Sequence, residues 1–189
     1  MSNKIDIINI PNNIYKIGEE AFFQCENLIE ANISDNVISI DDAAFTECHN
    51  LSKIHLSKNL EQIGMEAFAE TALSDVVLPD KLANISKYCF EKCEKLKHVK
   101  LGKYTVSVGM RSFAECSALE EVSLNEGLEE IQSYAFHGCN NLTKLYIPES
   151  VERISPDVFI TNEGLTILCK KDSIAHKHAE KYNMKYQLV

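Results

Sequence analysis

Residues 124–136 read Leu124-Asn-Glu-Gly-Leu128-Glu-Glu-Ile131-Gln-Ser-Tyr-Ala135-Phe136, and the pattern returns 23 residues later as Ile147-Pro-Glu-Ser-Val151-Glu-Arg-Ile154-Ser-Pro-Asp-Val158-Phe159. An earlier copy stands at Leu56-Ser-Lys-Asn-Leu60-Glu-Gln-Ile63-Gly-Met-Glu-Ala67-Phe68. A repeat of about 20–30 residues indicates that one small supersecondary unit is stacked on copies of itself. The sequence therefore predicts a solenoid, which offers long faces for binding and no ready-made catalytic pocket.

The same pattern extends through seven copies. They begin at the apolar residue that ends each expected strand: Ile10, Ile33, Leu56, Leu78, Leu101, Leu124 and Ile147. All intervals are 23 residues except the one from Leu56 to Leu78, which is 22. A phenylalanine recurs in every copy, at Phe22, Phe45, Phe68, Phe90, Phe113, Phe136 and Phe159. The missing residue falls in the turn after Phe68, where a change of loop length is tolerated best.

The spacing of apolar residues predicts the elements of each copy. The closing segment, Leu-x-x-Ile-x-Leu, alternates with a period of about two, which indicates a short strand with one buried face. The segment from the isoleucine to the phenylalanine has helix-like spacing, and six of the seven residues after the isoleucine are good N-caps. Pro156 follows one of them, Ser155, at the first helical position. We therefore expect each copy to be a strand, a turn, and a short helix or 3₁₀ turn.

Two motifs carry a resemblance to a known family. The pattern through Leu51, Ile54, Leu56 and Leu60 resembles the strand signature of leucine-rich repeats. The remainder, Ile-Gly-x-x-Ala-Phe-x-x-Cys-x-x-Leu, resembles the BspA-like, or treponemal-type, subclass over roughly residues 5 to 170. That resemblance implies a right-handed α/β solenoid with a parallel sheet on its concave face. It also implies a surface adhesin or interaction protein of bacteria and some protozoa.

We expect a single solenoid domain over residues 1–189. Within it, residues 1–10 form the first strand, residues 10–168 form seven repeats of about 23 residues, and residues 169–189 form a carboxy-terminal cap. The cap prediction rests on a helix that begins after Ser173, followed by alternating Met184, Tyr186 and Leu188. Ile174, Ala175, His178, Ala179 and Tyr182 are expected on the inward side of this helix.

Bulk composition restricts the classes of partner. A formal charge of −9 disfavours nucleic acid and anionic membrane surfaces. No run of 18 apolar residues occurs, so no membrane insertion is expected. The amino terminus lacks the basic start and long apolar stretch of a secretory signal, so we expect either an intracellular protein or a chain from which a signal has been removed.

Five of the seven cysteines occupy one repeat position, three residues after the phenylalanine: Cys25, Cys48, Cys93, Cys116 and Cys139. Stacking places equivalent residues about 5 Å apart across coils. A free cysteine behaves as a small hydrophobe in a core. We therefore interpret these residues as a broken ladder of structural thiols, while disulfides stay open as an alternative.

Catalytic and cofactor motifs are missing from the sequence. It contains no nucleophile elbow, phosphate loop, dinucleotide fingerprint or His-Glu-x-x-His motif, so we expect no enzyme, no cofactor and no metal. His176 and Glu180 are spaced four apart, as two metal ligands on one helix face would be, but the cap helix explains both residues without a metal.

The residues that the repeat leaves free to vary define the candidate binding face. In each strand, the side chains between the inward positions point out from the sheet. The first outward row is Glu30, Lys53, Asp75, His98, Glu121 and Lys144, and the second is Asn32, His55, Val77, Lys100, Ser123 and Tyr146. Signs alternate along the first row, which fits a self-neutralising ladder. The alternative is that these positions, and above all the second row, contact a protein partner.

The expected amino-terminal coil opens with Ile5-x-x-Ile8-x-Ile10 and has no covering segment. An uncovered coil is an edge that can pair with another chain. We therefore expect either a part of a longer array or a homodimer through this coil. For function, the sequence favours a surface-exposed protein-binding module, with an intracellular scaffold as the alternative.

Overall fold

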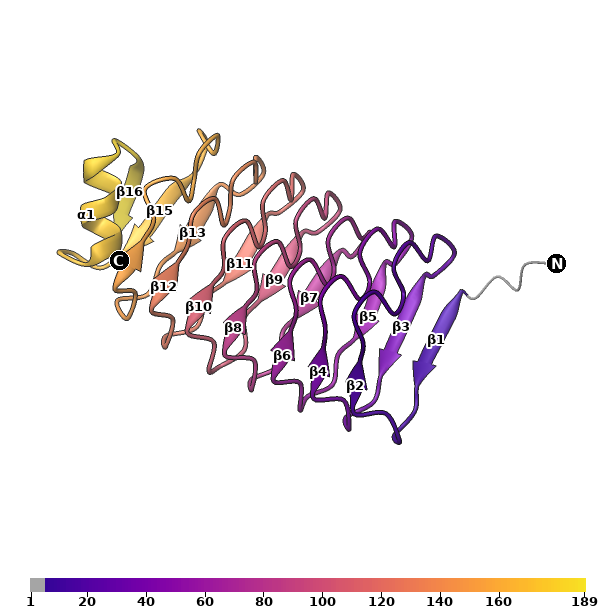
Figure 1. The fold of residues 1–189 in the computed structure, drawn as a ribbon. Coiled ribbons are helices and arrows are strands. Elements are labelled where there is room, and N and C mark those ends of the chain that lie inside the picture. Colours follow the sequence, from indigo (N-terminus) through magenta and orange to yellow (C-terminus); the bar gives the residue numbers. More distant parts are fainter. Residues whose placement is uncertain (1–5) are drawn as a thin grey trace.

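The computed structural model describes residues 6–189 as one continuous stack of flattened coils (Figure 1). Each coil contributes one longer strand to the first side of the stack. These strands are β1 (Ile7–Ile10), β3 (Glu30–Ile33), β5 (Lys53–His55), β7 (Asp75–Val77), β9 (His98–Lys100), β11 (Glu121–Ser123), β13 (Lys144–Tyr146) and β15 (Thr166–Cys169). The parallel-strand solenoid expected from the repeat is confirmed.

A second side of the stack is built from two-residue strands. They are β2 (Lys16–Ile17), β4 (Ser39–Ile40), β6 (Gln62–Ile63), β8 (Asn84–Ile85), β10 (Ser107–Val108), β12 (Glu130–Ile131) and β14 (Arg153–Ile154). Each carries one fully or partly buried isoleucine or valine, and these strands pair in parallel with the same position of the next coil, except between β6 and β8. The sequence analysis did not predict these strands, because two residues are too few to show an alternating pattern.

The 22-residue interval marks a break in the sheets. On the first side, the ladders run as β1-β3-β5, β7-β9-β11 and β13-β15-β16, and on the second side as β2-β4-β6 and β8-β10-β12-β14. Both sides therefore lose their strand pairing between the coil that ends at Phe68 and the coil that follows, and the first side loses it again between β11 and β13. The core continues across the first of these points, and backbone hydrogen bonds of the phenylalanine turns still cross it, as from the Phe68 N–H to the carbonyl of Cys89.

The core runs the length of the stack between the two sides. The seven repeat phenylalanines lie on one another with ring centroids 5.0–6.0 Å apart and planes within 15° of parallel. The leucine and isoleucine positions of the repeat pack beside them. Offset stacks of this spacing add stabilisation beyond the area that they bury. The repeat phenylalanine therefore explains why each coil sits in register on the last.

Of the short helix or 3₁₀ turn expected between the short strand and the phenylalanine, the helix is wrong, and the segment forms only turns. The segment forms turns in which amide groups alternate between two kinds of acceptor. In the first coil, Ala21 and Phe23 donate to the carbonyls three residues before them, whereas Phe22 and Gln24 donate to carbonyls of the next coil. In all but the last of these segments two residues have positive φ, as at Glu20 and Gln24, with φ of 54° and 55°. A left-handed residue every four positions prevents helix propagation, so the helix-like spacing of apolar residues is satisfied by turns.

Polar residues that follow the short strands bond across coils. Ser86, one of the residues interpreted as a helix N-cap, donates through Oγ to the carbonyl of Ile63. Near the same position of other coils, Asp42 Oδ1 accepts a hydrogen bond from the Met65 N–H at 2.7 Å, and Gln132 Oε1 accepts one from the Met110 N–H at 3.1 Å. These polar residues follow the short strand because orphaned backbone groups of the neighbouring coil need partners there.

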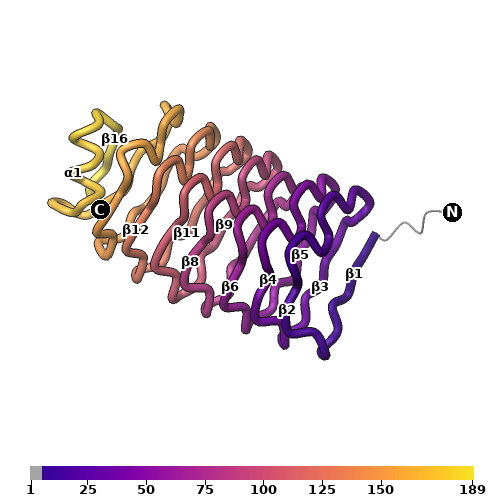
Figure 2. Tube along the Cα trace, viewed as in Figure 1, coloured from indigo at the N-terminus to yellow at the C-terminus, as the bar shows by residue number. Residues whose placement is uncertain are grey.

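The cap is present at the far end of the stack, where α1 (Ile174–Lys181) and β16 (Lys185–Leu188) follow the last coil (Figure 2). Ser173 is the N-cap, as expected, and accepts from the His176 N–H. Ala175, His178 and Ala179 are buried as expected. The expectation fails for Ile174 and Tyr182, which are both 38% exposed, and for His176, which is buried. The helix is rotated so that His176 packs against Tyr186 of the final strand. Of the expected first strand, residues 1–10, the structure shows β1, and residues 1–5 lie outside the described part.

Candidate interaction surface

The two predicted outward rows lie on the face formed by β3, β5, β7, β9, β11 and β13, here called the long-strand face. Within this face β3 pairs in register with β5, and β9 pairs in register with β7 and β11, so Asn32 lies beside His55, and Val77 beside Lys100 and then Ser123. Most residues of both rows are exposed: Lys53, His55, Asp75, Val77, His98, Lys100, Glu121, Ser123 and Lys144. Asn32 and Tyr146 are partly buried. The rows are therefore surface arrays at sheet spacing, as the alternation predicts.

The charges of the first row are only partly neutralised by their neighbours. His98 Nδ1 lies 2.6 Å from Asp75 Oδ1, and a hydrogen bond from Ser74 together with this contact lowers the pKa of Asp75. Among residues 6–189, no other neighbouring pair of this row approaches within salt-bridge distance. Both partners are largely exposed, so the pair stabilises the fold little. The ladder interpretation holds for this one pair, and Lys53, Glu121 and Lys144 keep charges that face solvent.

Two side chains give the second row an apolar and aromatic character. Val77 is 69% exposed, the largest exposed fraction among the bulky hydrophobic residues described. Tyr146 is more sheltered, and burial, with smaller contributions from Glu126 and Glu149, raises the pKa of its hydroxyl. Tyr146 therefore stays neutral near pH 7 and can donate a hydrogen bond. The exposed Val77, with His55 and Lys100 on the adjacent coils, gives this row the mixed apolar and polar character of a surface that can contact a protein.

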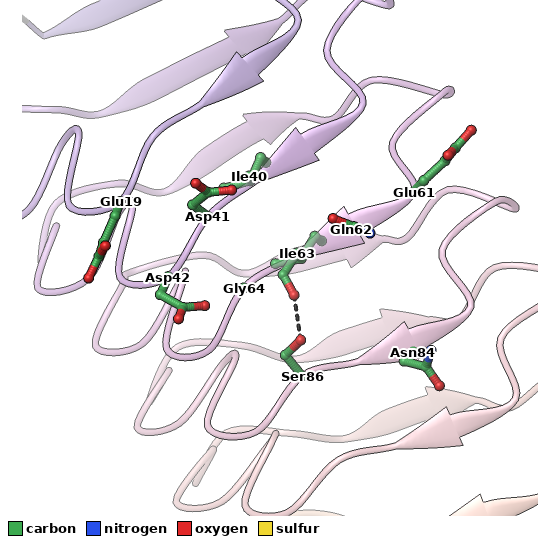
Figure 3. A pocket seen from close by; sticks show the side chains of 10 residues that line it. All are labelled: Glu19, Ile40, Asp41, Asp42, Glu61, Gln62, Ile63, Gly64, Asn84 and Ser86. Carbon is green, nitrogen blue, oxygen red and sulfur yellow. Dashed lines mark hydrogen bonds between the residues drawn. The ribbon is translucent and has the colours of Figure 1, made fainter.

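The short-strand side carries an acidic hollow that the sequence analysis did not identify. Its volume is about 410 Å³, and Glu19, Asp41, Asp42 and Glu61 contribute carboxylates from neighbouring coils (Figure 3). These groups are spread along the coils, and Asp41 already pairs with Lys16 at 2.7 Å. No group of three or more His, Cys, Asp or Glu side chains within residues 6–189 is placed to hold a metal ion. The signal in the sequence was the acidic residues beside the short strands: Glu19, Asp41 and Asp42 after them and Glu61 before one.

The cysteine ladder has a hydrogen-bonding role. The thiols of Cys48, Cys93, Cys116 and Cys139 donate to the carbonyl oxygen of the phenylalanine in the preceding coil at 3.0–3.1 Å. Asn162, at the same position of the last coil, donates to Phe136 in the same way. All seven cysteines are unpaired in the structure. The repeat position therefore selects a small side chain with a donor, which agrees with the interpretation as structural thiols.

Burial makes these thiols poor nucleophiles. It raises the pKa of Cys48 to about 12, of Cys93 to about 11 and of Cys139 to about 12. The pKa values of Cys89 and Cys116 are raised well above the ordinary range for the same reason. Since the thiolate is the reactive and metal-binding form, the ladder is not arranged for chemistry near neutral pH.

The cap histidines have structural surroundings. His176 Nε2 lies 3.6 Å from Glu180 Oε1, and its Nδ1 accepts from the Asp172 N–H at 3.1 Å. His178 packs edge-on against Phe159, and burial lowers its pKa, so the neutral form is favoured.

Of residues 6–189, no helix is long and apolar enough to cross a membrane.

Comparisons with known proteins agree on one family. The model of the BspA type leucine rich repeat region matches residues 1–97 and 42–166, with six copies. No curated protein matches this chain. A leucine rich repeat protein of T. pallidum is 26% identical, has a TM-score of 0.83, and is matched over 98% of this chain and 86% of its own.

Two more distant solved structures share the fold. A leucine-rich repeat protein from Bacteroides ovatus ATCC 8483 is 22% identical with a TM-score of 0.59, over 97% of this chain and 66% of its own. A leucine rich cell surface protein from Faecalibacterium prausnitzii A2-165 is also 22% identical, with a TM-score of 0.56, over 97% of this chain and 60% of its own.

Proposed function

The chain belongs to the BspA-type leucine-rich repeat family, and from that premise we propose that it is a non-enzymatic protein-binding module. Its partner is a protein, engaged through the long-strand face, which we take to be the concave side of a right-handed solenoid. The role is that of a cell-surface adhesin, in line with the cell-surface relative from F. prausnitzii. A fold of this kind presents a scaffold and leaves specificity to the residues on its face.

One observation carries the proposal: the second row presents an unusually exposed valine between polar neighbours at fixed spacing. Val77 is 69% exposed, while His55 and Lys100 on the adjacent coils are exposed as well. Tyr146 lies further along the row and keeps a neutral hydroxyl. Binding energy at protein interfaces concentrates in a few such apolar and aromatic residues surrounded by polar ones.

The experiment begins with capture of partners by the intact solenoid, followed by affinity measurement on the purified pair. We expect Tyr146→Ala and Val77→Ser each to weaken binding by about tenfold or more, as interface hot spots do. Tyr104→Ala is the matched control, because Tyr104 is 60% exposed and lies in a turn away from this face. Unchanged affinity in both long-strand variants would reject this face as the binding site.

The alternative function, an intracellular scaffold, would use the same face of the protein but in a different cellular compartment. The exposed rows suit either role, so the structure favours neither. Antibody labelling of intact cells, together with fractionation, separates the two: the adhesin proposal requires accessible protein at the cell surface. Protein confined to the soluble fraction of lysed cells would replace the adhesin role with an intracellular scaffold.

Self-association through the first coil is a second interaction that the geometry favours. In this coil Ala21 is exposed and Phe22 only partly buried, although the same positions are buried in the coils that follow. A second copy of the chain placing its own first coil here would bury both. Light scattering at rising protein concentration tests this, with Phe22→Glu as the variant that breaks the contact. A mass that stays monomeric up to millimolar concentration would exclude the homodimer.

A further inference from the structure

The middle of the long-strand face carries a group of basic side chains, here called the basic zone. It spans β5, β7 and β9, which are consecutive strands of this face (Figure 1). Two basic residues lie on the first of these strands and two on the last: Lys53 and His55 on β5, and His98 and Lys100 on β9. All four are exposed. A chain with a net charge of −9 therefore presents a local group of cations at the centre of its candidate binding face.

Most of these cations have no counter-charge. Among residues 6–189, Lys53, His55 and Lys100 form no ion pair. The exception is His98, whose Nδ1 lies 2.6 Å from Asp75 Oδ1. Asp75 is the acidic residue of β7, the strand between the two basic ones, so the carboxylate within the zone already has a partner. Two ammonium groups and one imidazole are thus available to a ligand.

Acidic residues bound the basic zone on both sides. Glu30 of β3 lies in register with Lys53, and Glu121 of β11 lies in register with His98. The zone between them extends from β5 to β9, which is roughly 10 Å at the usual spacing of strands. A long anionic polymer laid along the stack would meet a carboxylate beyond either end of the zone, whereas a short acidic stretch would not.

Val77 stands at the centre of the basic zone and is 69% exposed. Because β7 pairs in register with β9, Val77 lies beside Lys100. His55 occupies the equivalent position of β5. An apolar side chain between two basic positions is complementary to an apolar side chain between two carboxylates. Such a match would draw binding energy from the apolar contact and specificity from the charges.

We propose that the basic zone binds an extended acidic segment of the protein partner, in which a carboxylate lies two residues before and two residues after an apolar side chain. The inference rests on the function proposed above and specifies the chemistry of the partner. Every second side chain of an extended segment points to the same face, at intervals of about 7 Å. The apolar side chain contacts Val77. One carboxylate lies between Lys53 and His55, and the other lies beside Lys100.

The test is an NMR titration of the full ¹⁵N-labelled chain with the blocked peptide acetyl-Glu-Ser-Leu-Ser-Glu-amide. We expect saturable shifts of the Val77 and Lys100 amides, with a dissociation constant in the millimolar range because few contacts form. A matched peptide with glutamine in place of both glutamates should bind at least about fivefold more weakly, since it loses its charges. Raising the salt from about 50 to about 300 mM should weaken the acidic peptide about threefold and leave the glutamine peptide unchanged.

Protein variants locate the site. Lys53→Glu and Lys100→Glu should each weaken binding of the acidic peptide about fivefold, because an attraction becomes a repulsion. Lys171→Glu is the matched control, since it makes the same change of net charge at an exposed residue in the turn before α1. Glu121→Gln should strengthen binding about twofold, because it removes a carboxylate at the edge of the zone. Misfolding of a variant cannot produce such a gain.

The captured partner separates this proposal from the one on which it rests. If Val77→Ser and Tyr146→Ala weaken its binding but Lys53→Glu and Lys100→Glu do not, the long-strand face is retained and the acidic segment is rejected. Unchanged affinity in all four variants rejects the face itself. Absence of saturable peptide shifts, or equal binding of the glutamine peptide, would overturn the proposal. Tighter binding of an oligothymidylate of about 15 nucleotides than of the acidic peptide would replace the protein segment with an anionic polymer.

Discussion

The first coil and the central coils carry the same residue types in different surroundings. Ala21 is exposed and Phe22 partly buried at the open end, whereas Ala67 and Phe68 are fully buried in the centre. Glycine shows the same contrast: an added Cβ at Gly18 meets nothing within 4 Å among the described residues, but at Gly64 it would lie 2.5 Å from the carbonyl carbon of Asp41. A repeat position therefore has no fixed energetic value. Its value is set by the coil that covers it.

The phenylalanine ladder gives the largest difference between the two regions. Phe113 is fully buried between Phe90 and Phe136, with centroids at 5.4 and 5.6 Å. Phe113→Ala should lower the free energy of unfolding by about 3–5 kcal/mol, because a cavity opens in a continuous core. Phe22→Ala removes a half-buried ring stacked on one side only and should cost about 1–2 kcal/mol.

Urea denaturation of both phenylalanine variants measures this contrast. A central variant should also lose cooperativity, because a weakened contact divides the stack into two segments that unfold separately. Ladder pairing of both sheets is already missing between β5 and β7 and between β6 and β8, so the first division is expected there. Equal losses for Phe113→Ala and Phe22→Ala would show that covering by a neighbouring coil does not set the energy.

The matched glycines give the next largest effect. Gly64→Ala places a Cβ against backbone atoms of Asp41 and Asp42, which cannot move aside as the end of a flexible side chain could. The substitution should therefore lower the free energy of unfolding by about 1–3 kcal/mol. Gly18→Ala meets open space, so its thermal midpoint should stay within about 2 °C of the parent protein. Differential scanning calorimetry on the two variants gives the comparison directly. A large loss for Gly18→Ala would mean that a surface absent from residues 6–189 already covers the first coil.

Most of the fold could be predicted from the repeat period. It located the longer strands, the buried phenylalanines and the cap helix, because each follows from apolar spacing and from one cap residue, Ser173. The turns were mistaken for helices since apolar residues three and four apart serve both, and nothing in Glu20 or Ala43 signals a positive φ. Asn, Asp and Gly are the residues that most often adopt a positive φ, and neither position carries one of them.

The candidate surfaces were predicted to different extents. Period-two alternation placed both rows of the long-strand face correctly, because it depends only on local geometry. The acidic hollow on the short-strand side was not predicted, since Glu19, Asp41 and Glu61 come from successive coils and only the stacking of the coils brings them to one place. A self-neutralising ladder was one of two interpretations of the first row, and pairing is found for Asp75 and His98, because side-chain rotamers decide which charges meet.

The smallest effect on stability, and the sharpest contrast in chemistry, is expected for the thiols. Cys25 is partly buried in the first coil, whereas Cys48, Cys93, Cys116 and Cys139 are fully buried. With burial raising the pKa of Cys48 and Cys139 to about 12, their thiolate fraction at pH 8 is about one in ten thousand. We expect a disulfide reagent to label one thiol of the native protein quickly, and the buried ones only as fast as the stack opens.

Cys25→Ser identifies the fast thiol, since it should abolish the rapid phase and leave the slow one unchanged. The raised pKa values also set the direction of pH dependence. Stability contributed by the buried thiols is complete below the pKa of an unfolded cysteine, about 8.5, and declines as pH rises toward the folded values, because only the unfolded chain ionises there. Several fast-reacting thiols at pH 8 would mean that the interior coils open as readily as the first one, and the contrast between the two regions would disappear.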